Sequence, residues 1–206
     1  AEYLRKVDKE LVADKQDLEY RTRLFTREHG KILRESSMEM TRLGDRFLLC
    51  AEYANRLSQD EEIKGPPLDT IITKQARGVA LLIVPWNWPL SILGAKLPQA
   101  LITGNTVVIK LAYESPLAPA LTIKKMAETL PPGVINMVTG PSSEIGDALL
   151  SHPLIRKINF TGGIETGRHV MTMAARTLTP VTLELGGNDP AIVLEDAELD
   201  EQTIHR

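Results

Sequence analysis

Asn87 and Glu184 are the polar residues whose surroundings best suit catalysis. Asn87 lies in the stretch Val84–Pro89, between an apolar run and a helical pattern, where its amide N–H₂ group could stabilise developing negative charge. Glu184 stands between two leucines and before a glycine pair, where partial burial would suit a general base. Taken alone, each has a simpler explanation, Asn87 as a helix cap in a rigid turn and Glu184 as a strand residue facing water.

Two further groups of residues could bind the sugar or phosphates of a ligand. Gly104–Thr106 forms a turn before a short strand, and Lys110 at the end of that strand could hold ribose hydroxyls or a phosphate. Phe160–Gly163 runs from a strand through Gly162 and Gly163 into a helix, which directs free N–H groups at a pyrophosphate. The full Gly-x-Gly-x-x-Gly fingerprint is absent. Without further context, the lysine is more simply a solvated strand end and the glycines part of a turn.

The elements ahead of these motifs are predicted to be mostly helical. Residues 1–57 form an N-terminal helical segment, because apolar side chains recur there at helical spacing. Residues 58–77 are predicted to form a connection. Ser58–Pro67 is polar and ends in Gly-Pro-Pro, so no regular element is expected in it. Thr70–Gln75 alternates weakly and is predicted as the arm of an edge hairpin.

Residues 78–206 are predicted to form an incomplete dinucleotide-binding domain. Strand patterns alternate with helical ones there, which predicts an α/β fold with a doubly wound, mainly parallel Rossmann-like sheet preceded by N-terminal helices. The predicted strands are Val79–Val84, Val107–Ile109, Val134–Val138, Lys157–Phe160, Val181–Leu183 and Ala191–Leu194, and the predicted helices are Leu90–Ile102, Leu117–Leu130, Ser143–Leu150 and Glu165–Ala175.

Composition and charge exclude several classes of protein. With 24 Lys and Arg against 27 Asp and Glu, neither nucleic acid nor a membrane surface is an expected partner. The single Cys50 can form no internal disulfide, and the four histidines show no metal-ligand spacing, so no metal is predicted. No apolar run approaches the ~20 residues of a membrane span, and the charged start lacks a signal-peptide core. A cytoplasmic protein is therefore expected.

Taken together, the motifs resemble the NAD(P)-dependent aldehyde dehydrogenase superfamily. The resemblance covers nearly the whole chain, including a helix-turn segment near its start, and implies oxidation of an aldehyde to a carboxylic acid with NAD or NADP through a thioacyl intermediate. It rests on Glu28-His29-Gly30-Lys31, Pro85-Trp86-Asn87, Gly104-Asn105-Thr106 with Lys110, Phe160-Thr161-Gly162 and Glu184-Leu185-Gly186-Gly187, in this order.

The resemblance also implies a role for each matching residue. Asn87 would form an oxyanion hole with a backbone N–H, and Glu184 would activate the water that hydrolyses the thioacyl intermediate. Lys110 would bind the adenosine ribose, and the glycine pair would approach the pyrophosphate and nicotinamide. The implied cofactor-binding residues are Val84, Pro85, Trp86, Asn87, Lys110, Tyr113, Gly162, Gly163, Leu185 and Gly186. The parent protein would be a homo-oligomer, a dimer or tetramer, acting on a small-molecule aldehyde.

Three positions depart from the family pattern. Trp88 replaces a smaller aromatic ring, and Gly163 replaces a frequent serine, which removes a hydroxyl contact to phosphate. Tyr113 stands where a carboxylate usually binds the ribose. That carboxylate would bond the 2′-hydroxyl of NAD and repel the 2′-phosphate of NADP, so its loss leaves the choice between NAD and NADP open.

The nucleophile expected from the family is a cysteine a few dozen residues beyond Glu184, and the sequence reaches its last residue before that position. Cys50 lies in an apolar helical stretch and is predicted to be a buried, inert thiol. The chain is thus expected to be a fragment that is inactive alone. The alternatives are a non-catalytic nucleotide-binding or interaction module, or a truncated product without function.

Overall fold

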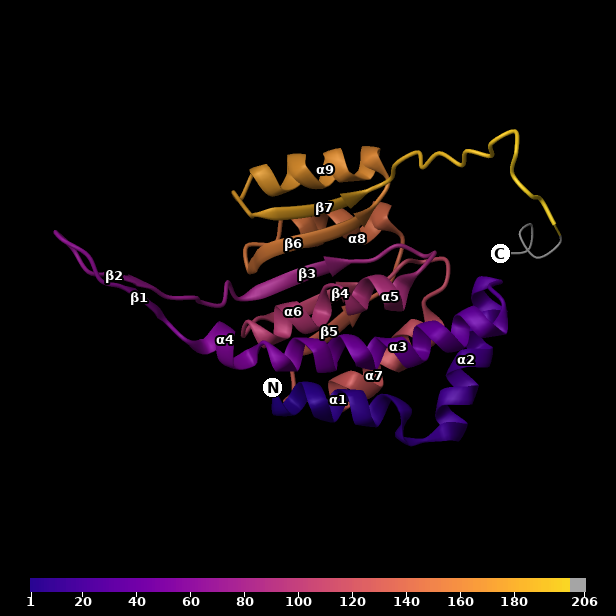
Figure 1. The fold of residues 1–206 in the computed structure, drawn as a ribbon, viewed down its shortest axis with the longest axis horizontal. Helices are drawn as coiled ribbons and strands as arrows, with labels where there is room; N and C mark the ends of the chain where they lie inside the picture. Colours follow the sequence, from indigo (N-terminus) through magenta and orange to yellow (C-terminus); the bar gives the residue numbers. More distant parts are fainter. Residues whose placement is uncertain (201–206) are drawn as a thin grey trace.

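A five-stranded parallel sheet is the framework of the chain, and this computed structural model describes residues 1–200 (Figure 1). The strand order is β5-β4-β3-β6-β7, so the sheet extends from β3 first through β4 and β5, and then in the opposite direction through β6 and β7. This topology confirms the predicted doubly wound α/β fold. The strands are β3 (Val79–Ile83), β4 (Thr106–Lys110), β5 (Ile135–Val138), β6 (Ile155–Gly162) and β7 (Val181–Leu185).

Helices cover both faces of the sheet, and the side chains of β3 alternate between the two cores. Ala80 and Leu82 belong to the larger core, and Leu81 belongs to the smaller one, which explains the continuous apolar run in this strand. The larger core includes α1 (Glu2–Ala13), α2 (Lys15–His29), α3 (Leu33–Glu52), α5 (Pro89–Gly94), α6 (Leu97–Ile102) and α7 (Leu117–Glu128), and the smaller includes α8 (Ser142–Leu150) and α9 (Ile164–Ala175). In Figure 1, α9 and α1 lie at opposite sides of the molecule.

Signals at both ends of α2 set the path of the N-terminal helices. The Asp14 carboxylate accepts hydrogen bonds from the backbone N–H groups of Gln16 and Asp17, at 2.9 and 3.1 Å, and so caps the start of α2. Gly30 ends the helix with a φ of 87°, and its N–H donates to the carbonyl of Thr26. This left-handed end lets the chain turn sharply into α3.

A short helix, α4 (Ala54–Ser58), leads into a hairpin of β1 (Glu61–Ile63) and β2 (Thr70–Ile72), which projects from the rest of the molecule (Figure 1). The expectation that Ser58–Pro67 contains no regular element was wrong, because β1 lies within it, paired with β2 in Thr70–Gln75. Both strands are exposed along their length. Without a buried face, β1 needs no alternating apolar pattern, so its residues carry no local strand signal.

Two further predictions were wrong in detail. The helix predicted over Leu90–Ile102 is broken into α5 and α6, since Pro98 has no N–H to donate to the carbonyl of Gly94. Ala191–Leu194 forms no strand, and Ile192 and its neighbours are exposed beyond β7 with no strand beside them among the described residues. Residues 201–206 of the predicted dinucleotide-binding domain lie outside the described residues.

None of the helices within residues 1–200 has both the length and the apolar character needed to cross a bilayer. In the same part of the chain, no group of three or more His, Cys, Asp or Glu side chains is arranged to hold a metal ion.

Asp17 and the buried Arg21 join the N-terminal helices to α7. The Asp17 carboxylate accepts a hydrogen bond from Arg21 Nε at 2.9 Å and pairs with Lys125 Nζ at 3.2 Å. Arg21 also donates to the carbonyl of Leu11 at 2.7 Å and to Thr122 Oγ1 at 3.2 Å. Burial alone would raise the pKa of Asp17, but the two cations outweigh it and lower the pKa.

We expect Asp17→Asn to lower the free energy of unfolding by about 1 kcal/mol at neutral pH, a small value because the Asp17 side chain is 34% exposed and solvent screens the pair. With a folded-state pKa below the unfolded one, this stabilisation is complete above the unfolded pKa and is lost as the pH falls through the folded pKa. Urea unfolding of both proteins from neutral to strongly acidic pH tests this. A difference in stability that stays constant with pH would contradict it.

Candidate functional site

The predicted catalytic and cofactor-binding residues meet at the carboxyl edge of the sheet, whereas Gly104–Thr106, at the start of β4, lies at the opposite edge. Val84 follows β3, Lys110 ends β4, Gly162 ends β6, and Leu185 ends β7. The register pairs Ile83 with both Lys110 and Phe160, and Gly162 with Leu185. Because β3 and β6 flank the point where strand order reverses, this edge is where an α/β sheet forms a ligand-binding crevice.

Asn87 lies in an exposed turn between β3 and α5. Its side-chain Oδ1 accepts a hydrogen bond from the N–H of Trp88 at 2.9 Å, and its Nδ2 group has no partner among the described residues. Asn87 does not cap α5, because the N–H groups of Leu90 and Ser91 are bound by Glu39 instead. The capping explanation therefore fails, and the amide N–H₂ group is available to a ligand.

The residues just before Asn87 differ in what they can offer a ligand. Val84 is buried, and its N–H donates to the carbonyl of Lys110 at 3.3 Å, so its side chain belongs to the core. Pro85 is partly buried, and Trp86 is exposed at the surface of the crevice. Of the three predicted cleft residues, Trp86 thus presents the largest accessible surface.

Lys110 is held in place at the end of β4. It is 6% exposed, and its Nζ donates to Ser142 Oγ, in the first turn of α8, at 2.9 Å. Burial lowers the pKa of Lys110, and the carboxylate of Glu114 opposes part of this shift. Tyr113, three residues further on, is exposed.

The start of α9 has free backbone donors. Gly163 precedes the helix. Within residues 1–200, no side chain caps the helix start, and a Cβ at Gly163 would meet no atom within 4 Å. Gly162 differs, since a Cβ there would lie 2.6 Å from the ring of Phe160. Thr161 Oγ1 is buried without a hydrogen-bond partner in the described part of the chain. Free N–H groups, open space and an unsatisfied hydroxyl form a donor set that fits the pyrophosphate of a dinucleotide.

Glu184 is exposed, so the partial burial predicted from its apolar neighbours was wrong. It lies on β7, the edge strand, where Val181 and Leu183 turn toward the smaller core and Glu184 points to the other face. Leu185 on β7 is paired with Gly162 on β6. Its side chain packs against α9, since a Cβ at Gly167 would lie 2.6 Å from Leu185 Cδ2. Gly186, directly beyond the strand, is exposed.

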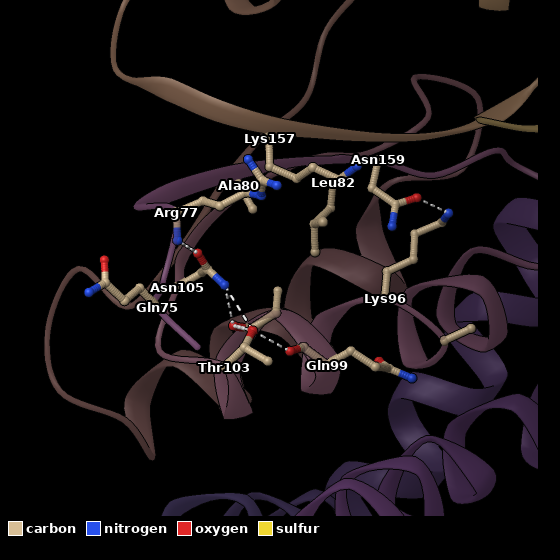
Figure 2. A pocket seen from close by; sticks show the side chains of 12 residues that line it. Gln75, Arg77, Ala80, Leu82, Lys96, Gln99, Thr103, Asn105, Lys157 and Asn159 are labelled. Carbon is tan, nitrogen blue, oxygen red and sulfur yellow. Dashed lines mark hydrogen bonds between the residues drawn. The ribbon is translucent and has the colours of Figure 1, made fainter. Parts of the chain in front are cut away.

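A pocket of about 340 Å³ lies on the same face of the sheet as Glu184, between β3, β6 and α6 (Figure 2). Lys96 and Asn159 are hydrogen-bonded at one end of it, and Arg77 and Lys157 line the other. Burial lowers the pKa of Lys96, and the Glu184 carboxylate opposes part of this shift. Asn105 of the Gly104–Thr106 motif lines this pocket, and the predicted catalytic and cofactor-binding residues do not.

Sequence reasoning did not find Lys96, Ser142 or Glu39, which all contact or neighbour the predicted residues. Lys96 could have been noticed, because it is a lone charge within the apolar run of α5 and α6. Glu39 and Ser142 gave no local signal, since their partners lie far away in sequence.

Cys50 is buried in α3, 7% exposed, within the larger core. Burial raises the pKa of its thiol, and Arg46 opposes part of this shift. The thiol is therefore held in its less nucleophilic, protonated form away from solvent.

Known proteins resemble this chain along most of its length. The model of the aldehyde dehydrogenase family matches residues 1–205. The chain is 42% identical over 195 residues to the mitochondrial succinate-semialdehyde dehydrogenase of Arabidopsis thaliana, covering 92% of this chain and 36% of that protein. It is 41% identical over 182 residues to an NADP(+) succinate-semialdehyde dehydrogenase of Escherichia coli (strain K12), covering 86% of this chain and 37% of that protein. The chain thus spans little more than a third of the length of these relatives.

The fold is also similar to a solved structure. A crystal structure of betaine aldehyde dehydrogenase from Staphylococcus aureus in complex with NAD+ matches with a TM-score of 0.86 and 36% sequence identity. The match covers 96% of this chain and 39% of that one. The sheet and helices described above are therefore similar in arrangement to the matching part of this relative's structure.

We expect Cys50 to react with iodoacetamide roughly tenfold or more slowly in the folded chain than in urea, because burial hides the thiol and raises its pKa. The rate should increase as the pH rises toward the alkaline range. Mass spectrometry of the alkylated protein measures both effects. Equal rates in the folded and unfolded chain would show that the thiol is accessible.

Proposed function

Because the chain belongs to the aldehyde dehydrogenase family, we propose that it is the cofactor-binding portion of an enzyme that oxidises an aldehyde to a carboxylic acid with NAD or NADP. The observation that carries this proposal is that the predicted catalytic and cofactor-binding residues lie together at the carboxyl edge of β3, β4, β6 and β7. Since the chain spans little more than a third of its relatives' length, the activity of the whole protein and its small-molecule aldehyde substrate are part of the proposal.

Residues 78–206 contribute the dinucleotide-binding domain, with residues 1–57 as its helical support and 58–77 as the connection with its hairpin arm. The pyrophosphate binds at the start of α9, beside Gly162 and Gly163, where donors are free and space is open. When bound, the dinucleotide supplies the hydride acceptor.

Two ends of the cofactor are held by different strands. Lys110, with Tyr113 beyond it, binds the adenosine ribose, and the bond from Lys110 to Ser142 orients the ammonium group. At the other end, Pro85 and Trp86 line the cleft, with Val84 behind them in the core. Leu185 and Gly186 complete the cofactor-binding residues. Leu185 is paired with Gly162 across the sheet, and Gly186 directly follows Leu185.

Asn87 and Glu184 act on the reacting carbon. The Nδ2 group of Asn87 donates to the oxygen of the aldehyde as it gains negative charge, which fits a group without another partner in residues 1–200. Glu184 takes a proton from the water that hydrolyses the thioacyl intermediate, and its exposure gives water access to the carboxylate. The sulfur of that intermediate comes from a cysteine of the whole protein other than Cys50, which is buried.

The burial of Cys50 favours a second function for the 206-residue chain by itself, that of a module that binds the dinucleotide without oxidising aldehydes. We further propose a reducing compartment such as the cytoplasm, in line with the single buried thiol. A homo-oligomer, dimer or tetramer, is supported by the exposed apolar side chains of the hairpin, such as Ile63 and Ile71.

We expect both NAD+ and NADP+ to change the fluorescence of Trp86 and Trp88 in the purified chain. Lys110→Met should weaken binding of either dinucleotide by about tenfold, because it removes a charged hydrogen bond to the ribose. Lys124→Met is the matched control, since Lys124 is an exposed lysine on α7 that pairs with Glu128.

With succinate semialdehyde added, the chain alone should bind cofactor but form no reduced dinucleotide. Failure of both dinucleotides to change the fluorescence, or equal losses of affinity in the Lys110 and Lys124 variants, would refute the proposed binding mode.

Tyr113→Glu is expected to weaken NADP+ binding by roughly tenfold while maintaining or raising NAD+ affinity, since the new carboxylate repels the 2′-phosphate and accepts a hydrogen bond from the 2′-hydroxyl. Tyr113→Phe serves as the uncharged control. The ratio of the two dissociation constants, taken from the same fluorescence titration, gives the result. A ratio that Tyr113→Glu leaves unchanged would remove Tyr113 from the ribose site.

A further inference from the structure

Lys31 and Glu39 form a buried ion pair between the α2–α3 connection and α3. Their side chains are 4% and 0% exposed, and the Nζ to Oε2 distance is 2.5 Å. Burying two opposite charges is costly even when they pair, and apolar residues of similar volume are often as stable or more so. Stability alone therefore does not explain a charged pair at this position.

The other hydrogen bonds of the pair are made to the turn that carries Asn87. Glu39 Oε1 accepts from the backbone N–H groups of Leu90 at 2.8 Å and Ser91 at 2.9 Å. Lys31 Nζ donates to the carbonyl oxygen of Asn87 at 3.0 Å. The pair, which we call the Lys31–Glu39 clamp, thus holds the backbone at Asn87 and again a few residues later.

The side chain of Asn87 is oriented by the same backbone. The peptide that joins Asn87 to Trp88 accepts from Lys31 through its carbonyl and donates to Asn87 Oδ1 through its N–H, at 2.9 Å. The Lys31 ammonium also lies 4.1 Å from the ring centroid of Trp88. On the other side of Asn87, His29 Nε2 lies 2.9 Å from the carbonyl oxygen of Trp86. Both peptides that flank Asn87 are therefore anchored by side chains from the α2–α3 junction.

We propose that Lys31 and Glu39 are positioning residues that fix the direction of the Asn87 amide. This inference rests on the role proposed above for Asn87 in oxidation of the aldehyde. A donor to a developing oxyanion must be held within a fraction of an ångström of its productive position, and a displacement of about 1 Å costs on the order of 100-fold in rate. The clamp supplies that rigidity. Two residues of the Glu28–Lys31 motif, His29 and Lys31, thus help to hold the backbone beside Asn87.

The double variant Lys31→Met with Glu39→Leu separates positioning from stability. It leaves neither charge unpaired, so its urea midpoint should fall less than that of either single variant, the remaining loss coming from the N–H groups of Leu90 and Ser91. The hydrogen-exchange rates of the Leu90 and Ser91 amides should nevertheless rise by roughly tenfold or more, because their acceptor is gone.

Arg21→Met is the matched control. Arg21 is another fully buried cation, but its partners Leu11 and Thr122 lie outside the turn. This variant should lower the urea midpoint and leave Leu90 and Ser91 protected relative to the rest of α5.

Kinetics of the whole protein test the catalytic consequence. The double variant should lower kcat by about 100-fold with little change in the KM for aldehyde. In an Asn87→Ala background, the same double substitution should have little further effect, because the clamp acts through Asn87. A purely structural role would give multiplicative losses instead.

Either multiplicative losses in kcat or unchanged exchange at Leu90 and Ser91 would overturn the positioning role. A wild-type protein that oxidises no aldehyde would refute the proposed function. The exchange rates would then still decide whether the clamp holds the turn, so the two failures can be told apart.

Discussion

The central position of β3 is the constraint on which the rest of the structure depends. Its backbone is paired with β4 on one edge and β6 on the other, and its side chains are buried on both faces. A strand held in this way cannot shift without disturbing both cores. Its carboxyl end is therefore a fixed point, and the turn that carries Asn87 starts from it. The other motifs are positioned relative to that point through the register of the neighbouring strands.

Buried cations join parts of the fold that are far apart in the sequence. Arg21 bonds to α1 and α7, Lys31 bonds to the turn after β3, and Lys110 bonds to the first turn of α8. Each is almost fully removed from solvent and each has a named acceptor, as burial of a charge requires. The N-terminal helices are thus joined to the site by directional polar contacts as well as by apolar packing.

Sequence reasoning identified the sheet because its signal is local. The apolar run from Val79 to Ile83 and the glycine turns after the strands follow from burial on two faces and from tight connections. It missed β1, which has no buried face, and it assigned Glu184 to a partly buried position because two leucines flank it. On an edge strand those leucines do not cover the carboxylate. Whether a strand lies at an edge is a property of the whole sheet and cannot be read from neighbouring residues.

Glu39 could not be identified as a site residue from the sequence for a different reason. Glu39 lies on α3, and its acceptor role becomes visible only when α3 is placed beside the start of α5, some fifty residues along the chain. A buried glutamate within an amphipathic helix gives no hint of its partner. Long-range polar contacts of this kind need the tertiary structure before they can be identified.

Gly167 has a consequence for how this site can change over evolutionary time. Its missing Cβ allows Leu185 to lie against α9, so the end of β7 and the helix that starts at the glycine pair share one contact. A larger residue at this position would meet Leu185 Cδ2, so the Leu185 side chain, which is 41% exposed, would have to turn away from α9. Substitutions at Gly167 and at Leu185 are therefore coupled, because each side chain takes the space that the other leaves.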